Sequence, residues 1–194
     1  ASDVYKRQEM NLAKSLSESC DVYFYELALK VGIERINKMA IKLGLGVKHD
    51  IPMSAITKGL VPSKEWKSNN RDQEWLIGDT VNASIGQGYV LSSPLQLAIM
   101  AARLANGKNV KPILIKSING KNIHNIENIE DLDIEKSHLK IVRKALFQAS
   151  NDRRCTAYGS RVINDAYRIA GKTGTSQVRN ITDAERENLS LIHI

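Results

Sequence analysis

The 194-residue sequence has few aromatic residues and no long apolar run. Aromatic side chains make up 5% of the residues, which offers little for a base-stacking platform. The basic residues behind the net charge of +7 are scattered along the chain. We therefore interpret the positive charge as a solvated surface and expect no nucleic-acid partner. Because no 18 consecutive residues are apolar, the sequence contains no candidate membrane-spanning helix.

Cysteine and histidine are also sparse. The two cysteines, Cys20 and Cys155, are too few for a disulfide framework. The four histidines form no His-x-x-x-His or comparable pair, so we expect no metal site. Residues 1–8 (ASDVYKRQ) and 189–194 (LSLIHI) resemble translated adapter sequence and are expected to be non-native, which leaves residues 9–188 as part of one domain.

Apolar periodicity predicts helices first and strands late, an α+β arrangement. Helices are expected over residues 20–30, 33–43, 94–105 and 134–149. The first of these is densely apolar and is expected to be buried on most sides. The third has Ser93 as N-cap, Pro94 at its first position and Gly107 just beyond its end.

The remaining segments are interpreted as irregular or strand-like. Residues 47–79 lack a sustained period and predict a long irregular segment. Residues 110–118 alternate like a strand that ends at an Asn119-Gly120 turn. Residues 167–178 are expected to form a further strand.

That last segment contains AGKTGTSQV, residues 170–178, which has two possible chemical interpretations. Gly171-Lys172-Thr173 resembles the end of a phosphate-binding P-loop. However, that motif needs a glycine at position 166, where the chain has alanine, and a helix that begins at the lysine. Lys172-Thr173-Gly174-Thr175 also resembles one wall of a serine acyl-transfer site. An isolated Lys-Thr-Gly could equally be a hairpin turn.

A second candidate is Ser19-Cys20-Asp21, which lies where a helix-compatible stretch over residues 10–17 meets the helix predicted over residues 20–30. It offers a hydroxyl and a carboxylate for acid-base chemistry. The alternative is that Ser19 only caps the helix that follows.

These two motifs, about 150 residues apart, correspond to the second and third members of the Ser-x-x-Lys, Ser-Asp-Asn and Lys-Thr-Gly set. The chain resembles the transpeptidase domain of class B penicillin-binding proteins, most closely the elongation-type penicillin-binding protein 2. The resemblance runs through SCDVYFYELALKVGIERI, VNASIGQGYVLSSPLQLAIMAARLANG and AGKTGTSQV. It implies a penicillin-binding protein/serine β-lactamase-like transpeptidase fold, truncated at both ends.

The resemblance also implies a function. The expected activity is peptidoglycan D,D-transpeptidation through an acyl-serine intermediate, without a cofactor. Peptidoglycan stem peptides, β-lactams and membrane proteins of the elongation machinery are the expected partners. Such a domain would lie in the periplasm, held by an inner-membrane anchor outside this segment. A serine β-lactamase-like hydrolase and a non-catalytic β-lactam-binding sensor or assembly module remain alternatives.

The site roles follow from the matching positions. Ser19 would relay a proton to or from the leaving amine, Asp21 would hold neighbouring polar groups, and Lys172 would keep the site positive and polarise Ser19. Thr173 and Thr175 would bind a substrate carboxylate, and the Thr175 amide would form half of the oxyanion hole.

Two further positions also have expected roles. Gly174 would let substrate approach the backbone. The middle signature, Ser84-Ile85-Gly86-Gln87-Gly88, is interpreted as a structural turn.

Three departures from the family pattern matter. Asp21 stands where the wider family usually has Asn, and Cys155-Thr156-Ala157 stands where Gly-Thr-Ala is expected. The first motif has no suitable match. Ser137-His138-Leu139-Lys140 has its spelling but lies between the other two motifs, inside a predicted helix. The nucleophile is therefore expected upstream, and the chain itself is expected to be inactive.

Overall fold

The computed structural model describes residues 10–123 and 128–176. Its elements are α1 (Leu12–Glu18), α2 (Asp21–Val31), α3 (Ile33–Lys42), α4 (Lys64–Arg71), α5 (Ile77–Ser84), α6 (Pro94–Asn106), β1 (Ser117–Ile118), β2 (Lys121–Asn122) and α7 (Lys136–Asn151). Two short 3-10 helices follow, Tyr158–Ser160 and Asp165–Tyr167. In this part of the chain, no helix is both long and apolar enough to cross a membrane.

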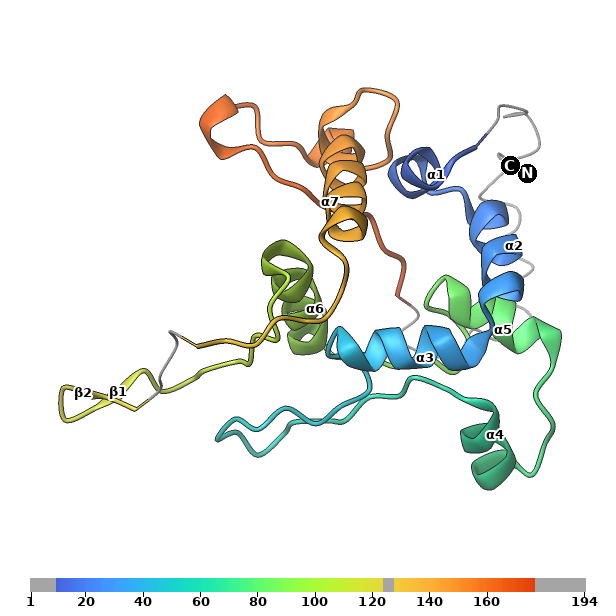
Figure 1. The fold of residues 1–194 in the computed structure, drawn as a ribbon, viewed down its shortest axis with the longest axis horizontal. Coiled ribbons are helices and arrows are strands. Elements are labelled where there is room, and N and C mark those ends of the chain that lie inside the picture. The colour runs from blue at the N-terminus through green and yellow to red at the C-terminus, as the bar shows by residue number, and fades with distance from the viewer. Residues whose placement is uncertain (1–9, 124–127, 177–194) are drawn as a thin grey trace, which may run out of the picture.

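The helices pack in two groups that bring distant segments together. Helix α1 lies beside α7, while α2 contacts α5 and α3 (Figure 1). The α1–α7 contact is made of small side chains, because Ser15, Ala145 and Ala149 are fully buried. The Ser15 hydroxyl donates to the Asn11 carbonyl at 2.8 Å, so its burial leaves no unpaired group. This close packing sets the end of α1 near the residues that follow α7.

Helix α6 forms as the sequence predicts. The Ser93 hydroxyl accepts from the Gln96 amide, and the Gln96 side chain accepts from the Ser93 amide, which completes a capping box. Gly107 ends the helix in a left-handed conformation with φ of 69°. The Gln96 side chain also donates to the carbonyls of Val47 and Lys58, so it ties the preceding irregular segment to this helix.

The Asn119-Gly120 turn is confirmed, but the predicted strand is much shorter than expected. Both turn residues have positive φ, and Ser117 and Ile118 pair with Asn122 and Lys121 in an antiparallel hairpin. Figure 1 shows this hairpin projecting away from the helices. Residues 110–116 alternate in polarity but form no ladder with any described segment, so the pattern alone does not make them a strand.

Helix α4 lies inside the segment that was expected to be irregular. Its sequence, KEWKSNNR, has little apolar periodicity, and its start is capped by the Ser63 hydroxyl, which accepts from the Trp66 amide at 3.0 Å. The helix instead buries Lys67, whose ammonium lies 2.6 Å from the Asp79 carboxylate in α5. Apolar periodicity does not predict such a helix, because the residue that anchors it to the fold is charged.

Two other expectations also need correction. Helix α2 is not buried on most sides, because Val22 and Leu29 are each about half exposed and only its Ala28 is fully buried among the described residues. Residues 168–176 form no strand, because no described segment pairs with them, and residues 177 and 178 lie outside the described part. A strand needs a hydrogen-bonded neighbour, which an alternating sequence cannot supply by itself.

Candidate active site

The two sequence motifs line the same pocket. Its volume is about 420 Å³, and its lining is Leu16, Ser19, Asp21, Phe24, Ser84, Ile85, Gln87, Lys172, Thr173, Gly174 and Thr175. The pocket thus joins the α1–α2 junction, the turn after α5 and the Lys-Thr-Gly segment. All six of the candidate residues identified from the sequence contribute to it.

Ser19 does not cap α2, so that alternative is wrong. The N-cap of α2 is Cys20, and Ser19 is instead the C-cap of α1, with φ of 59° and ψ of 53°. This left-handed conformation is uncommon for a residue with a Cβ and costs about 1–2 kcal/mol. Strain of this kind is concentrated at functional sites. The turn places the Ser19 hydroxyl beside the chain that follows α7.

Helix α7 anchors the Lys-Thr-Gly segment. The Asn151 side chain donates to the Ile169 carbonyl at 2.9 Å, and the Gly171 amide donates to the Leu146 carbonyl at 3.1 Å. A Cβ at position 171 would lie 3.3 Å from the Ser150 hydroxyl, so glycine permits this close approach. The same helix holds the next loop, because the Ala157 amide donates to the Ala149 carbonyl.

A chain of hydroxyl groups connects the two motifs. The Ser19 and Thr156 hydroxyls lie 2.9 Å apart, and the Thr173 hydroxyl donates to Thr156 at 3.1 Å. The Lys172 ammonium donates to the Thr173 hydroxyl at 3.2 Å and to its carbonyl at 3.1 Å. Lys172 is therefore linked to Ser19 through two threonines. Sequence reasoning missed Thr156, although its place in the Cys-Thr-Ala triplet was a signal.

The electrostatics of Lys172 depend on its surroundings. Partial burial of the ammonium by neighbouring protein atoms lowers the pKa of Lys172 below its ordinary value of 10.5. The negative charge of Asp21 acts in the opposite direction. The net effect is a lysine that gives up its proton more readily than one in water, close to a hydroxyl relay.

The middle signature does more than form a turn. Gly86 and Gly88 have positive φ, at 76° and 70°, which confirms the turn. Between them, the Gln87 side-chain amide donates to the Thr175 carbonyl at 3.0 Å. Gln87 therefore fixes the backbone of the third motif, a role that the sequence interpretation did not assign. A polar amide between two turn glycines was the available signal.

Gly174 has open space beside it. A Cβ built at this position would meet no heavy atom of the chain within 4 Å. Its φ also lies outside the left-handed region that favours glycine. The packing of this chain therefore gives no reason for glycine at position 174.

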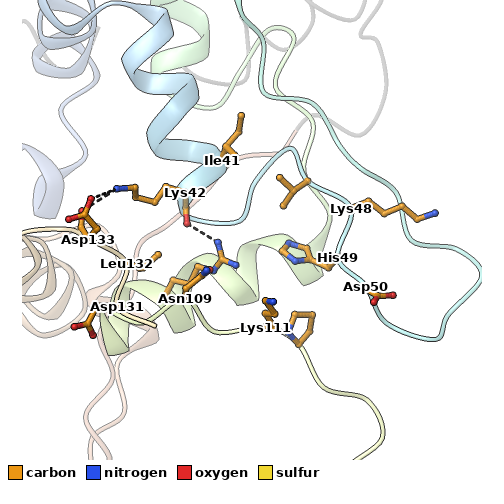
Figure 2. Close-up of a pocket in the computed structure, with 13 residues that line it drawn as sticks. Ile41, Lys42, Lys48, His49, Asp50, Asn109, Lys111, Asp131, Leu132 and Asp133 are labelled. Atoms are coloured by element: carbon orange, nitrogen blue, oxygen red, sulfur yellow. Dashed lines mark hydrogen bonds and ion pairs between the residues drawn. The ribbon is translucent and has the colours of Figure 1, made fainter. Parts of the chain in front are cut away.

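A larger pocket of about 670 Å³ lies elsewhere, between α3, α6 and the segments around residues 109–112 and 131–133 (Figure 2). None of the motif residues lines it. Two of its cations have internal partners, because Lys42 pairs with Asp133 at 3.4 Å and Arg103 donates to the Lys42 carbonyl at 2.7 Å. We therefore place the chemistry at the smaller pocket.

Comparison with known proteins gives consistent matches. The family described as the penicillin binding protein transpeptidase domain matches residues 2–191. The peptidoglycan D,D-transpeptidase MrdA of Acinetobacter baumannii is 34% identical over 180 residues, which cover 92% of this chain and 27% of that protein. The chain thus spans less than a third of the length of this relative.

Solved structures agree with the sequence matches. Pseudomonas aeruginosa PBP2, solved in complex with WCK 5153, is 37% identical with a TM-score of 0.78, over 87% of this chain and 39% of that chain. Helicobacter pylori PBP2, solved in complex with MreC, is 32% identical with a TM-score of 0.75. The match covers 87% of this chain and 31% of that chain.

Proposed function

The chain belongs to the penicillin-binding protein transpeptidase domain family, of the PBP2 or MrdA type, and we propose that it is part of a peptidoglycan D,D-transpeptidase. One observation carries the proposal most strongly. The Ser19 junction and the Lys172–Thr175 segment, far apart in sequence, line a single pocket and are joined by hydrogen-bonded hydroxyls. This arrangement supports a serine acyl-transfer site, because a hydroxyl chain and a lysine ammonium lie at one pocket.

In the proposed reaction, a serine upstream of the 194 residues attacks a carbonyl of the stem peptide. Its oxygen forms an ester as the bond to the leaving amine breaks, and an amine of a second stem peptide later displaces the serine. Ser19 donates its proton to the nitrogen of the leaving amine, and the proton that the attacking serine loses replaces the one that Ser19 has given up. The positive charge of Lys172 acts on Ser19 through the hydroxyl chain, while Asp21 opposes the loss of that charge.

The third motif is proposed to hold the substrate. The hydroxyls of Thr173 and Thr175 would accompany Lys172 in binding a substrate carboxylate. The Thr175 amide would donate to the oxyanion, a type of contact worth about 10²–10³ in rate. Gln87 supports this assignment, because its bond to the Thr175 carbonyl fixes the orientation of the same peptide segment. The open space beside Gly174 would admit the substrate backbone.

We further propose a periplasmic location, with an anchor in the bacterial inner membrane. Stem peptides and β-lactams are the proposed ligands, and membrane proteins of the elongation machinery are the proposed partners. The complex of Helicobacter pylori PBP2 with MreC supports the last of these.

Acylation by a penicillin tests this function on the complete protein. We expect a covalent adduct that persists for many minutes after the free penicillin is removed. Rapid turnover of the adduct would instead favour a serine β-lactamase-like hydrolase. Failure to form any adduct would leave only a non-covalent sensor or assembly role.

A further inference from the structure

We propose that Thr156 is a positioning residue for acyl transfer, whose hydroxyl aims the Ser19 proton into the pocket. This inference rests on the proposed function. It adds a residue between the Ser19 and Lys172 motifs, and it assigns that residue a direction of donation.

The direction follows from the donors available along the chain. A lysine ammonium has only hydrogens to offer, so the Thr173 hydroxyl must accept from Lys172. The Thr173 hydroxyl then uses its own hydrogen to donate to Thr156. Thr156 in turn has one hydrogen left, and polarisation along the chain favours its donation to the Ser19 oxygen, which lies 2.9 Å away. The Ser19 hydrogen is thereby released from this pair and is available to a group bound in the pocket.

A purely structural role does not explain these contacts. The Thr156 residue is exposed, so its hydroxyl could be satisfied by water without any protein partner. Both of its protein partners, Ser19 and Thr173, instead line the pocket. The anchoring of the loop to α7 is made by the backbone of the next residue, Ala157, which does not depend on the side chain at position 156.

The opposite orientation would have a different consequence. If the Ser19 hydrogen pointed at Thr156, the Ser19 oxygen would face the pocket only as an acceptor. Proton transfer from Ser19 to a leaving amine would then first require rotation of the Ser19 hydroxyl. The ammonium at the far end of the chain opposes this orientation, because it makes Thr173 the donor to Thr156, and a Thr156 hydroxyl polarised in this way is a better donor to Ser19.

The inference predicts different behaviour for two substitutions in the complete protein. Thr156→Val keeps the shape of the side chain but removes the hydroxyl, whereas Thr156→Ser keeps the hydroxyl and removes the methyl group. We expect Thr156→Val to slow acylation by a penicillin roughly 3- to 10-fold, the effect of one neutral hydrogen bond. Thr156→Ser should remain within about twofold of the wild type, because it retains the donor.

The experiment measures acylation across a range of penicillin concentrations, so that the maximal rate and the half-saturating concentration are obtained separately. We expect Thr156→Val to lower the maximal rate and leave the half-saturating concentration unchanged, because the hydroxyl acts on proton transfer and not on binding. Thr57→Val, an exposed threonine in the segment between α3 and α4, serves as the matched control and should change neither value. Melting temperatures of all the variants are measured in parallel.

Two results would overturn the inference. In the first, Thr156→Val is acylated at the wild-type rate. In the second, Thr156→Ser loses as much rate as Thr156→Val, which would assign the effect to methyl packing. A wild-type protein that is never acylated is a distinct result, because it would overturn the proposed function itself.

Discussion

The hydroxyl of Ser19 lies 2.9 Å from that of Thr156, 137 residues further along the chain. The contact exists because α1 and α7 pack through small buried side chains, which brings the ends of both helices together. The geometry of the site therefore depends on the packing of these two helices.

Ser19 combines a strained backbone with a polar side chain, so its two roles can be separated. Ser19→Gly removes the hydroxyl and relieves the left-handed strain, so we expect the melting temperature to be unchanged or raised while acylation falls strongly. Ser19→Ala removes the hydroxyl but keeps the strain, and it should lose acylation to a similar extent without the gain in stability. Equal acylation by Ser19→Gly and the wild type would contradict a role for the hydroxyl.

The lowered pKa of Lys172 predicts loss of activity at alkaline pH. Acylation should decline at a pH below 10.5, as the ammonium loses its proton. Asp21→Asn removes the charge that opposes this loss, so the decline should move to still lower pH. The measurement is the rate of acylation against pH, corrected for spontaneous penicillin hydrolysis. A decline unchanged by Asp21→Asn would refute the coupling of these two residues.

The same pKa shift predicts how stability depends on pH. Between the lowered folded-state pKa of Lys172 and 10.5, the unfolded chain binds the proton that the folded chain has released. The free energy of unfolding contributed by this group should therefore rise with pH across that window, and its burial penalty is fully present below the folded-state pKa. Lys172→Met should remove this contribution, as measured by urea unfolding at several alkaline pH values.

Gln87 should affect the reaction through the Thr175 backbone. Gln87→Ala leaves the Thr175 carbonyl without its side-chain donor, and we expect acylation to slow roughly 2- to 10-fold. Gln73→Ala, which changes an exposed glutamine between α4 and α5, is the matched control and should have no effect. If both variants behaved alike, the contact between Gln87 and Thr175 would have no catalytic importance.

The Lys67–Asp79 pair should stabilise the fold without contributing to the site. Its ammonium and carboxylate lie 2.6 Å apart, and the two side chains are only 3% and 14% exposed. Lys67→Met leaves a buried carboxylate without its partner, so we expect a loss of about 3–5 kcal/mol in the free energy of unfolding. Lys108→Met breaks the exposed pair with Asp131 and should have a much smaller effect, because water screens both charges. Similar losses of unfolding free energy for both variants would show that burial does not determine how strongly an ion pair stabilises this fold.

Local signals in the sequence were sufficient for some elements and not for others. Helix α6 and the Asn119-Gly120 turn are specified by capping and turn residues that act within a few positions of the chain, so both were predicted. Helix α4 was missed because its anchor is a charged pair with α5. The strand predicted over residues 167–178 would need a hydrogen-bonded partner strand, and the local sequence does not identify one.

The candidate site shows a similar division. Ser19 and the Lys172–Thr175 segment were identified from residue types in a known order, and the structure brings them to one pocket. Thr156 and Gln87 became visible only with the fold, because their contacts span 137 and 88 residues. No local pattern encodes a contact across that separation.

The most direct test of the account is to locate the penicillin adduct by mass spectrometry of the complete protein. We expect an adduct on a serine upstream of the 194 residues, and slower formation of that adduct when Ser19 or Lys172 is replaced. We also expect no saturable labelling of the isolated 194-residue chain. An adduct on a serine within residues 10–188, such as Ser19 or Ser137, would contradict the assignment of Ser19 as the partner of an upstream nucleophile.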